Sequence, residues 1–172
     1  MELLAQFARG DLEAFEALFR QFQREVYGWI IRIVRDRWVA EDLTVETFWR
    51  IYKAHARFDP NRSFHPWARR IATNVALDYL KRVRPEVEFV ESISQEKPPD
   101  PALRRDMQER IARAFSRLPA KLRVAATLAL IEEKPYEEIA EALEISVGGV
   151  KSRIFRAVRR LRKELKAQGL EP

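Results

Sequence analysis

Four polar residues near the carboxyl end of the chain have types and spacings that suit recognition of DNA bases. They are Ser146, Lys151, Ser152 and Arg156. Lysine and arginine donate hydrogen bonds to guanine, and serine can pair with any base edge. Gly148 and Gly149 leave little bulk between the first two of them. The chemistry expected here is therefore noncovalent, a set of hydrogen bonds to bases in the major groove of duplex DNA.

Two helices must position these residues. The first is short and amphipathic and begins near Tyr136, and the second begins at Val147 after a tight turn. The apolar side chains of the second helix recur every three or four residues, at Val150, Ile154, Val158, Leu161 and Leu165. Its remaining faces carry Lys151, Arg153, Arg156, Arg159, Arg160, Arg162 and Lys163.

This arrangement is typical of a helix-turn-helix, whose second helix enters the major groove. The alternative is a solvated basic helix that closes a bundle, but the glycine-opened start and the preceding acidic helix favour DNA binding. Phe155 lies off the apolar stripe and could touch a thymine methyl group. The predicted duplex contacts are Ser146, Lys151, Ser152, Arg153, Phe155, Arg156 and Arg160.

Composition narrows the function classes. The 172 residues carry 32 Lys and Arg against 26 Asp and Glu, a formal charge of +6 that suits a polyanionic partner. The absence of cysteine excludes disulfides and thiolate metal sites, and His55 and His65 are the sole histidines. With no glycine-rich phosphate loop either, neither an enzyme nor a cofactor is expected. Lacking a signal-type or membrane-length apolar run, the protein is expected in the cytoplasm, with no membrane partner.

The periodicity predicts an all-α protein of two small helical domains, 1–84 and 104–172, joined by an extended linker over 85–103. This linker holds five acidic residues, one lysine and four of the nine prolines. In the first domain, Asp11 is predicted to cap a long helix and a second helix to cover 39–56. Pro66 is predicted to open a third helix to about Arg82, with its buried side formed by Trp67, Ile71, Val75 and Leu80.

Several motifs in both halves resemble one family. Residues 40–50 read AEDLTVETFWR, 58–67 read FDPNRSFHPW, and Arg70-Ile71-Ala72-Thr73-Asn74 and Asp78-Tyr79-Leu80 follow. Leu118-Pro119 and the helix-turn-helix complete the set. Together they resemble the extracytoplasmic-function (ECF), or group IV, sigma factors of bacterial RNA polymerase. The resemblance implies a sigma region 2 over 1–84 and a sigma region 4 over 104–172.

The resemblance also implies a function and two DNA elements. Such a factor binds core polymerase and directs promoter-specific initiation, with the helix-turn-helix on the −35 element as duplex and region 2 on the melted −10 strand. A flipped base needs an aromatic or apolar pocket and a group that reads its edge, which Asn74 could supply. The predicted −10 contacts are Asn61, Arg62, Ser63, Phe64, His65, Trp67, Arg70, Asn74 and Lys81.

Four of these contacts have an alternative, structural interpretation. Phe64 and Trp67 also suit the hydrophobic core, and Asn74 could instead bond a neighbouring backbone group. His65 could cap the helix that follows. Arg69 is a further candidate phosphate ligand.

In the resemblance, 40–50 corresponds to the helix that binds the polymerase clamp. The predicted clamp contacts are Glu41, Asp42, Thr44, Val45, Glu46, Phe48 and Arg50. Region 4 is expected to bind the polymerase flap, and the acidic linker either imitates nucleic acid in a polymerase channel or serves as a plain spacer. An anti-sigma protein is an expected partner.

One alternative stays open from sequence. A helical sensor or dimerisation domain joined to a helix-turn-helix would make a stand-alone transcriptional regulator, which binds duplex DNA without polymerase. That class differs from a sigma factor in giving core polymerase no promoter preference.

Overall fold

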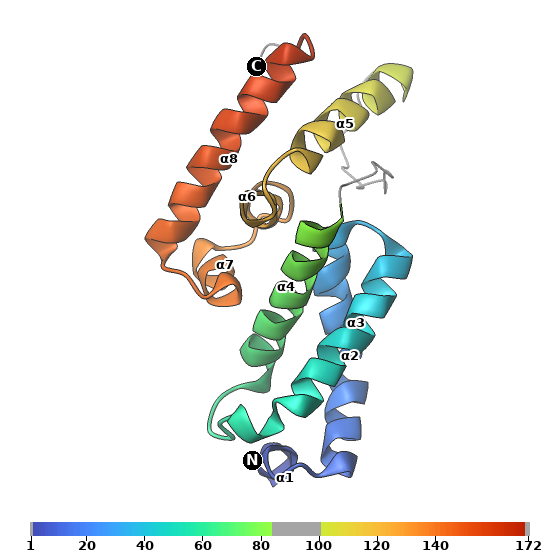
Figure 1. Ribbon diagram of the computed structural model, residues 1–172, viewed down its shortest axis with the longest axis vertical. Coiled ribbons are helices and arrows are strands. Elements are labelled where there is room, and N and C mark those ends of the chain that lie inside the picture. Colours follow the sequence, from blue (N-terminus) through green and yellow to red (C-terminus); the bar gives the residue numbers. More distant parts are fainter. Residues whose placement is uncertain (1, 84–100, 171–172) are drawn as a thin grey trace.

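The computed structural model describes residues 2–83 and 101–170. Over those ranges every regular element is a helix, so the predicted all-α fold is confirmed (Figure 1). None of the helices there has the length and apolar content needed to cross a membrane. Most of the predicted 85–103 linker lies outside the described residues, and its last three residues already belong to a helix.

The amino-terminal half is a bundle of three long helices with a short one across its end. Asp11 accepts a hydrogen bond from the Ala14 amide at 2.8 Å, which caps the first long helix as predicted. Asp36 caps the next helix through the Val39 amide at 3.0 Å. The helices are α1 (Glu2–Ala8), α2 (Leu12–Val34), α3 (Arg37–Lys53) and α4 (Phe64–Arg82), with a 3₁₀ turn at His55–Arg57.

The start of α4 differs from the prediction. The helix begins at Phe64 after Ser63, so Pro66 is its third residue rather than its first, and His65 is not the cap. Proline is still tolerated there, because amides of the first helical turn have no intrahelical acceptor.

The buried face of α4 also differs from the prediction. It consists largely of small residues at four-residue steps, Ala68, Ala72 and Ala76, together with Val75. The predicted Trp67, Ile71 and Leu80 are only half-buried. Alanines let neighbouring helices approach closely, and α4 indeed contacts α2 and α3 on one side and α6 and α7 on the other (Figure 1).

The carboxyl-terminal half holds the helix-turn-helix. Its helices are α5 (Pro101–Ser116), α6 (Ala120–Ala126), the π-helical segment η2 (Thr127–Ile131), α7 (Tyr136–Leu143) and α8 (Val147–Ala167). Pro135 precedes α7 and allows it to begin normally. Glu144 ends α7 in the left-handed conformation, with φ of 54°, a conformation that glycine adopts more readily. The turn is therefore sharp without a glycine.

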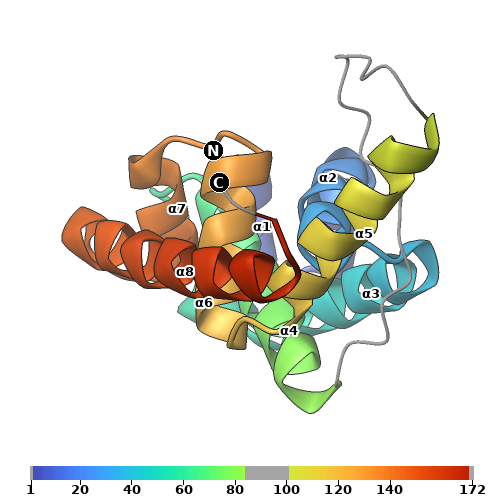
Figure 2. The same cartoon turned by 90° about the horizontal axis from the view of Figure 1, so that it is seen from above.

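The two halves are docked through one continuous core. A single cluster of buried side chains joins residues of α2, α3 and α4 to Val124 and Leu128, and to Ile139, Val150 and Ile154. A smaller cluster links α5, α6 and α8. The sequence predicted two small helical domains joined by a linker and left open whether they dock onto each other. In both views α4 lies between α2 and α3 on one side and α6 and α7 on the other, and α8 lies on the outside (Figures 1 and 2).

Candidate nucleic-acid interface

The first residues of α8 are held in place by a cap. Ser146 Oγ accepts a hydrogen bond from the Gly149 amide at 3.0 Å, which fixes where the helix begins. A Cβ at Gly149 would lie 3.4 Å from the Cβ of Ile145, so the small residue lets the turn pack tightly against the helix. The start of α8 is thus defined by its cap, and Lys151 and Ser152 are exposed in its first turns.

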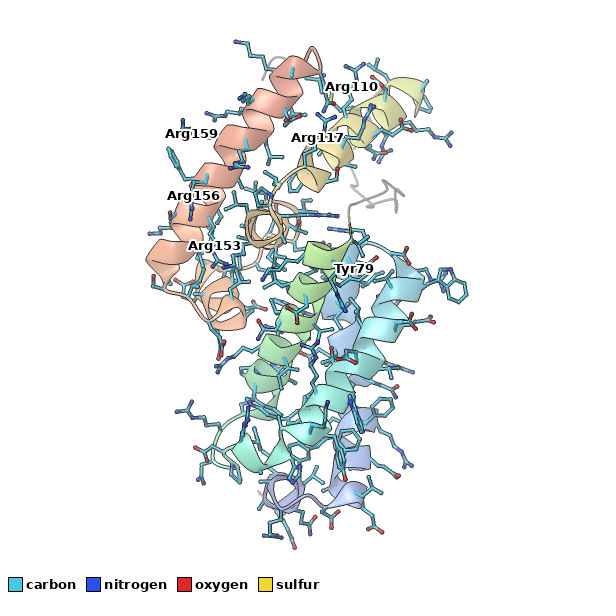
Figure 3. The ribbon with its side chains drawn as sticks, viewed as in Figure 1. Tyr79, Arg110, Arg117, Arg153, Arg156 and Arg159 are labelled. Atoms are coloured by element: carbon cyan, nitrogen blue, oxygen red, sulfur yellow. The ribbon has the colours of Figure 1, made fainter. Side chains whose placement is uncertain are left out.

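Most predicted duplex contacts lie on the exposed side of α8. Val150, Ile154, Ala157 and Leu161 form its buried stripe. Phe155 is 65% exposed, as its place off that stripe predicted. Figure 3 shows Arg156 and Arg159 extending from the outer side of α8. The exposed predicted contacts are Ser146, Lys151, Ser152, Phe155, Arg156 and Arg160.

Arg153 lies at the edge of this surface and is only half-exposed. Burial, followed by the nearby positive charge of Arg156, lowers the pKa of Arg153 from its ordinary value. An arginine remains charged under such a shift. Arg153 therefore suits a phosphate at the groove edge better than a base in the groove centre.

A second candidate surface is a cleft where the chain enters α4. Its volume is about 570 Å³. Phe58 and Trp67 supply aromatic wall, and Arg62 and Arg70 supply positive charge. The complete lining is Arg57, Phe58, Asp59, Arg62, Ser63, Pro66, Trp67, Arg70 and Glu141. The cleft thus combines an aromatic surface with cations, as single-strand binding requires.

The loop before α4 is shaped by Asp59. Its carboxylate accepts hydrogen bonds from the Asn61 amide at 3.0 Å and from Asn61 Nδ2 at 3.1 Å. Arg62 Nε lies 3.7 Å from the same carboxylate. Asn61, Arg62 and Ser63 remain exposed, so three of the predicted −10 contacts are accessible in this loop, and Arg62 and Ser63 line the cleft.

Asn74 and Lys81 lie farther along α4 and are both exposed. In the described part of the chain Asn74 has no hydrogen-bond partner from its side chain, so the interpretation that it bonds a neighbouring backbone group finds no support. Its amide therefore has both a donor and an acceptor available to a ligand.

Phe64 was predicted to contact DNA, and this is wrong for the conformation described. Its side chain is 3% exposed. The ring packs against its neighbours with centroid separations of 4.9 Å to Phe22 and 5.8 Å to Phe7, Phe58 and Trp67. Trp67 belongs to the same aromatic cluster, but it is half-buried and lines the cleft.

Three basic side chains in the first half of α4 are already paired with acidic residues or with each other. His65 Nε2 contacts the Glu25 carboxylate and lies 2.7 Å from Arg69 Nη2. Arg69 also forms an ion pair with Glu138 of α7, and Arg70 forms one with Glu144. Neither acidic partner could be inferred from the sequence, since both lie about seventy residues away.

The predicted clamp contacts on α3 divide into exposed and buried residues. Glu41, Asp42 and Val45 are exposed, and Glu46 and Arg50 are half-exposed. Glu46 accepts a hydrogen bond from Arg50 Nε at 2.8 Å, and Asp78 accepts one from Arg50 Nη1 at 3.0 Å. These bonds raise the pKa of Arg50 above its ordinary value. The side chains of Glu46 and Arg50 are therefore held in place by hydrogen bonds within region 2.

Thr44 and Phe48 face inward, so predicting them as surface contacts is wrong. Thr44 Oγ1 donates a hydrogen bond to the Ala40 carbonyl at 2.6 Å, and Phe48 is 2% exposed. Sequence reasoning missed Trp38 and Trp49, which are 79% and 53% exposed. Their steps of seven and four residues from Val45 place all three on one helical face. That spacing could have predicted an exposed apolar face on α3 from the sequence.

Two family models match the chain in order. Sigma-70 region 2 covers residues 18–86, and Sigma-70 region 4 covers residues 108–161. RNA polymerase sigma-H factor of Pseudomonas aeruginosa is 34% identical over 91% of this chain and 88% of that protein. ECF RNA polymerase sigma factor SigW of Bacillus subtilis is 32% identical over 95% of each.

Solved structures show the same architecture. CnrH, solved in complex with the cytosolic domain of CnrY, superposes with a TM-score of 0.61 at 27% identity over 96% of each chain. RpoE of Bartonella quintana, in complex with the anti-sigma factor NepR, shares the fold with a TM-score of 0.53 at 24% identity over 90% of this chain and 98% of that chain.

The exposed basic helix, the cleft at the start of α4 and these matches lead to one assignment. The region 2 model matches residues of α2, α3 and α4, and the region 4 model matches residues of α5 to α8. The relatives also cover nearly the whole chain. The chain belongs to the ECF sigma factors, the alternative sigma factors that direct RNA polymerase to initiate transcription.

Proposed function

We propose that the chain binds core RNA polymerase and gives it preference for one class of promoter. Region 2 (1–84) takes the polymerase clamp on the outer face of α3 and the melted −10 strand in the cleft. Region 4 (104–172) takes the −35 duplex on α8 and binds the polymerase flap. Residues 85–103 connect them. The observation that carries the proposal is that one chain presents two different basic surfaces, the exposed side of α8 and a cleft before α4 lined by Trp67 and arginines.

Each surface suits its strand for a physical reason. The exposed cations of α8 neutralise duplex phosphates, and its capped start brings Lys151 and Ser152 to base edges. The cleft of region 2 offers the half-buried ring of Trp67 to unstacked bases, with Arg62 beside it for phosphate. The exposed apolar side chains of Trp38, Val45 and Trp49 favour a protein partner on α3.

The remaining partners follow from the family. CnrH and RpoE were each solved with a protein bound, and the partner of RpoE is an anti-sigma factor, so an anti-sigma protein is proposed here too. The chain acts in the cytoplasm, where the polymerase is, as a specificity subunit with no catalytic activity or cofactor of its own.

Transcription with purified components tests the proposal. Core polymerase lacking any sigma factor is incubated with a promoter library, with and without the chain, and start sites are mapped. The chain should confer initiation at a distinct set of sites that share an upstream and a downstream element. Tight binding of duplex DNA by the chain alone, with no promoter preference given to polymerase, would instead indicate a stand-alone regulator.

Asn74→Ala should impair promoter opening while leaving polymerase binding unchanged. The side chain is exposed on α4 and offers a donor and an acceptor to a base. Permanganate footprinting on a matched promoter should show fewer reactive thymines around the start site. An equal loss of affinity for core polymerase, measured by gel filtration of the mixture, would identify Asn74 as structural.

A further inference from the structure

The aromatic wall of the cleft is supported by a side chain from α1. Phe7 is fully buried, with an exposed fraction of 0%. Its ring centroid lies 5.8 Å from those of Phe58 and Phe64 and 6.1 Å from that of Trp67. Phe58 and Phe64 are buried themselves, while Trp67 is half-buried and lines the cleft. Phe7 therefore lies behind the ring that is proposed to stack on a base.

Packing with its neighbours limits where the Trp67 ring can lie. Its centroid is 4.9 Å from that of Phe58, in the loop before α4, and 5.8 Å from that of Phe64, in α4 itself. Of the rings beside Trp67 in the described part of the chain, Phe7 alone comes from another helix. Interiors are close-packed, so a smaller side chain at position 7 leaves space into which the neighbouring rings can shift. Such a shift changes the wall of the cleft.

The turn after α1 contacts the beginning of the same loop. Gly10 has φ of 88°, a conformation that other residues rarely adopt. A Cβ at Gly10 would lie 2.9 Å from His55 Nε2, so the turn lies directly against the His55 ring. His55 begins the 3₁₀ turn that leads to Phe58, and its Nδ1 lies 2.7 Å from the Tyr52 carbonyl oxygen. Figure 1 shows α1 at the end of the bundle where α3 connects to α4.

We propose that α1 is a positioning element of the single-strand site. Phe7 and Gly10 hold the cleft wall in the shape that receives an unstacked base, and they act through Trp67 and the 3₁₀ turn rather than by touching the strand. Stacking depends on the placement of the ring, because a base and an aromatic side chain must lie in van der Waals contact. The inference rests on the proposed function, since it assumes that the cleft receives the melted −10 strand.

Phe7→Leu is the first test. Leucine keeps an apolar side chain in α1 but removes the ring that supports the cleft wall. Holoenzyme assembled with this variant should bind a fluorescent oligonucleotide, the non-template strand of a mapped promoter, roughly 5- to 10-fold less tightly than the parent holoenzyme. That loss lies at the lower end of the effect of removing one base–aromatic stack.

Phe48→Leu is the matched control for Phe7→Leu. Phe48 is 2% exposed, and its ring contacts Phe15 and Phe19 rather than the cleft wall. The control holoenzyme should bind the oligonucleotide like the parent. Equal losses in both variants would reflect a general loss of stability and overturn the inference.

Gly10→Ala tests the turn by a change outside the aromatic cluster. The new Cβ would collide with His55 on a backbone of positive φ, so the turn should move away from the 3₁₀ turn. Binding of the same oligonucleotide should weaken, as in Phe7→Leu. Gly28→Ala is the control, because a Cβ at Gly28 meets no atom within 4 Å, and its binding should not change. Unchanged binding by Gly10→Ala would overturn the inference, and this variant decides the question if Phe7→Leu does not fold.

A spectroscopic signal distinguishes positioning from a loss of stability. Incorporation of fluorotryptophan gives one fluorine NMR signal for each of the four tryptophans, and Trp67→Phe identifies the signal of Trp67. That signal should shift in Phe7→Leu and stay in place in Phe48→Leu. The signal of Trp38, which is 79% exposed on α3, should stay in place in both. A Trp67 signal at the parent position in folded Phe7→Leu would overturn the inference.

Trp67→Ala separates this inference from the proposed function. If Trp67→Ala holoenzyme binds the oligonucleotide like the parent, the cleft is not the single-strand site, and the proposed function of the cleft fails together with this inference. If Trp67→Ala weakens binding but Phe7→Leu and Gly10→Ala do not, the positioning role of α1 fails and the proposed function stands. Weaker binding in all three variants, with both controls unchanged, supports the inference.

Discussion

Phe64→Ala is expected to lower the free energy of unfolding by about 3–5 kcal/mol, the range for removing a buried phenylalanine. The ring is 3% exposed and contacts four other aromatic side chains. Its loss would leave a cavity where α1, α2 and α4 meet. Because α4 carries both Arg70 and Asn74, promoter opening should decline as a consequence of the lost stability.

Urea denaturation followed by circular dichroism measures this change. Phe155→Ala is the matched control, since it removes the same ring from a side chain that is 65% exposed. Its unfolding free energy should change by no more than about 0.5 kcal/mol. If Phe64→Ala unfolded like the parent but failed to open promoters, the ring would belong to the DNA site and the conformation of free region 2 would differ from the bound one.

Sequence patterns predicted correctly those features that depend only on neighbouring residues, such as helix caps and the exposed side of a helix. Asp11 caps its helix as predicted, because a side-chain oxygen three residues before a free amide accepts its hydrogen bond in almost any context. The exposure of Phe155 follows from the helical period of α8 alone. These features needed no knowledge of the rest of the chain.

The core of α4 could not be predicted in the same way. Periodicity favours large apolar residues as the buried face, yet Ala68, Ala72 and Ala76 are buried. Their burial depends on α6 and α7 packing from the side opposite α2 and α3. The pairing of Arg70 with Glu144 has the same origin. Contacts between residues distant in the sequence decide both the burial of these alanines and this ion pair. Such contacts cannot be predicted from the pattern of a single sequence.

The candidate site shows the same division. Most predicted residues on α8 and in the loop before α4 are exposed, because exposure there follows from helical period and loop chemistry, and their contacts with DNA stay predictions. Phe64, Thr44 and Phe48 were misplaced because a family motif mixes residues that hold the scaffold with residues that meet the partner. Burial separates the two kinds, and it requires the structure.

Arg156→Ala and Lys151→Ala are each expected to cost about 1–3 kcal/mol in upstream promoter recognition, with relaxed preference at one base pair. Both side chains are exposed near the capped start of α8. Arg156 Nε lies 3.4 Å from the Ser152 carbonyl, which leaves the remaining guanidinium donors directed outward for a guanine. Selection of active promoters from a randomised upstream element by the reconstituted holoenzyme would show which position loses its preference.

Arg162→Ala supplies the comparison. Arg162 is exposed near the end of α8, far from the capped start, and should contact phosphate only. Its loss should weaken all promoters by a similar factor and lower the magnitude of the salt dependence by about one counterion, without changing the selected sequence. A uniform loss of the same kind for Arg156→Ala would mean that Arg156 contacts phosphate as well. The bases would then be read by residues nearer the start of the helix, Ser146, Lys151 and Ser152.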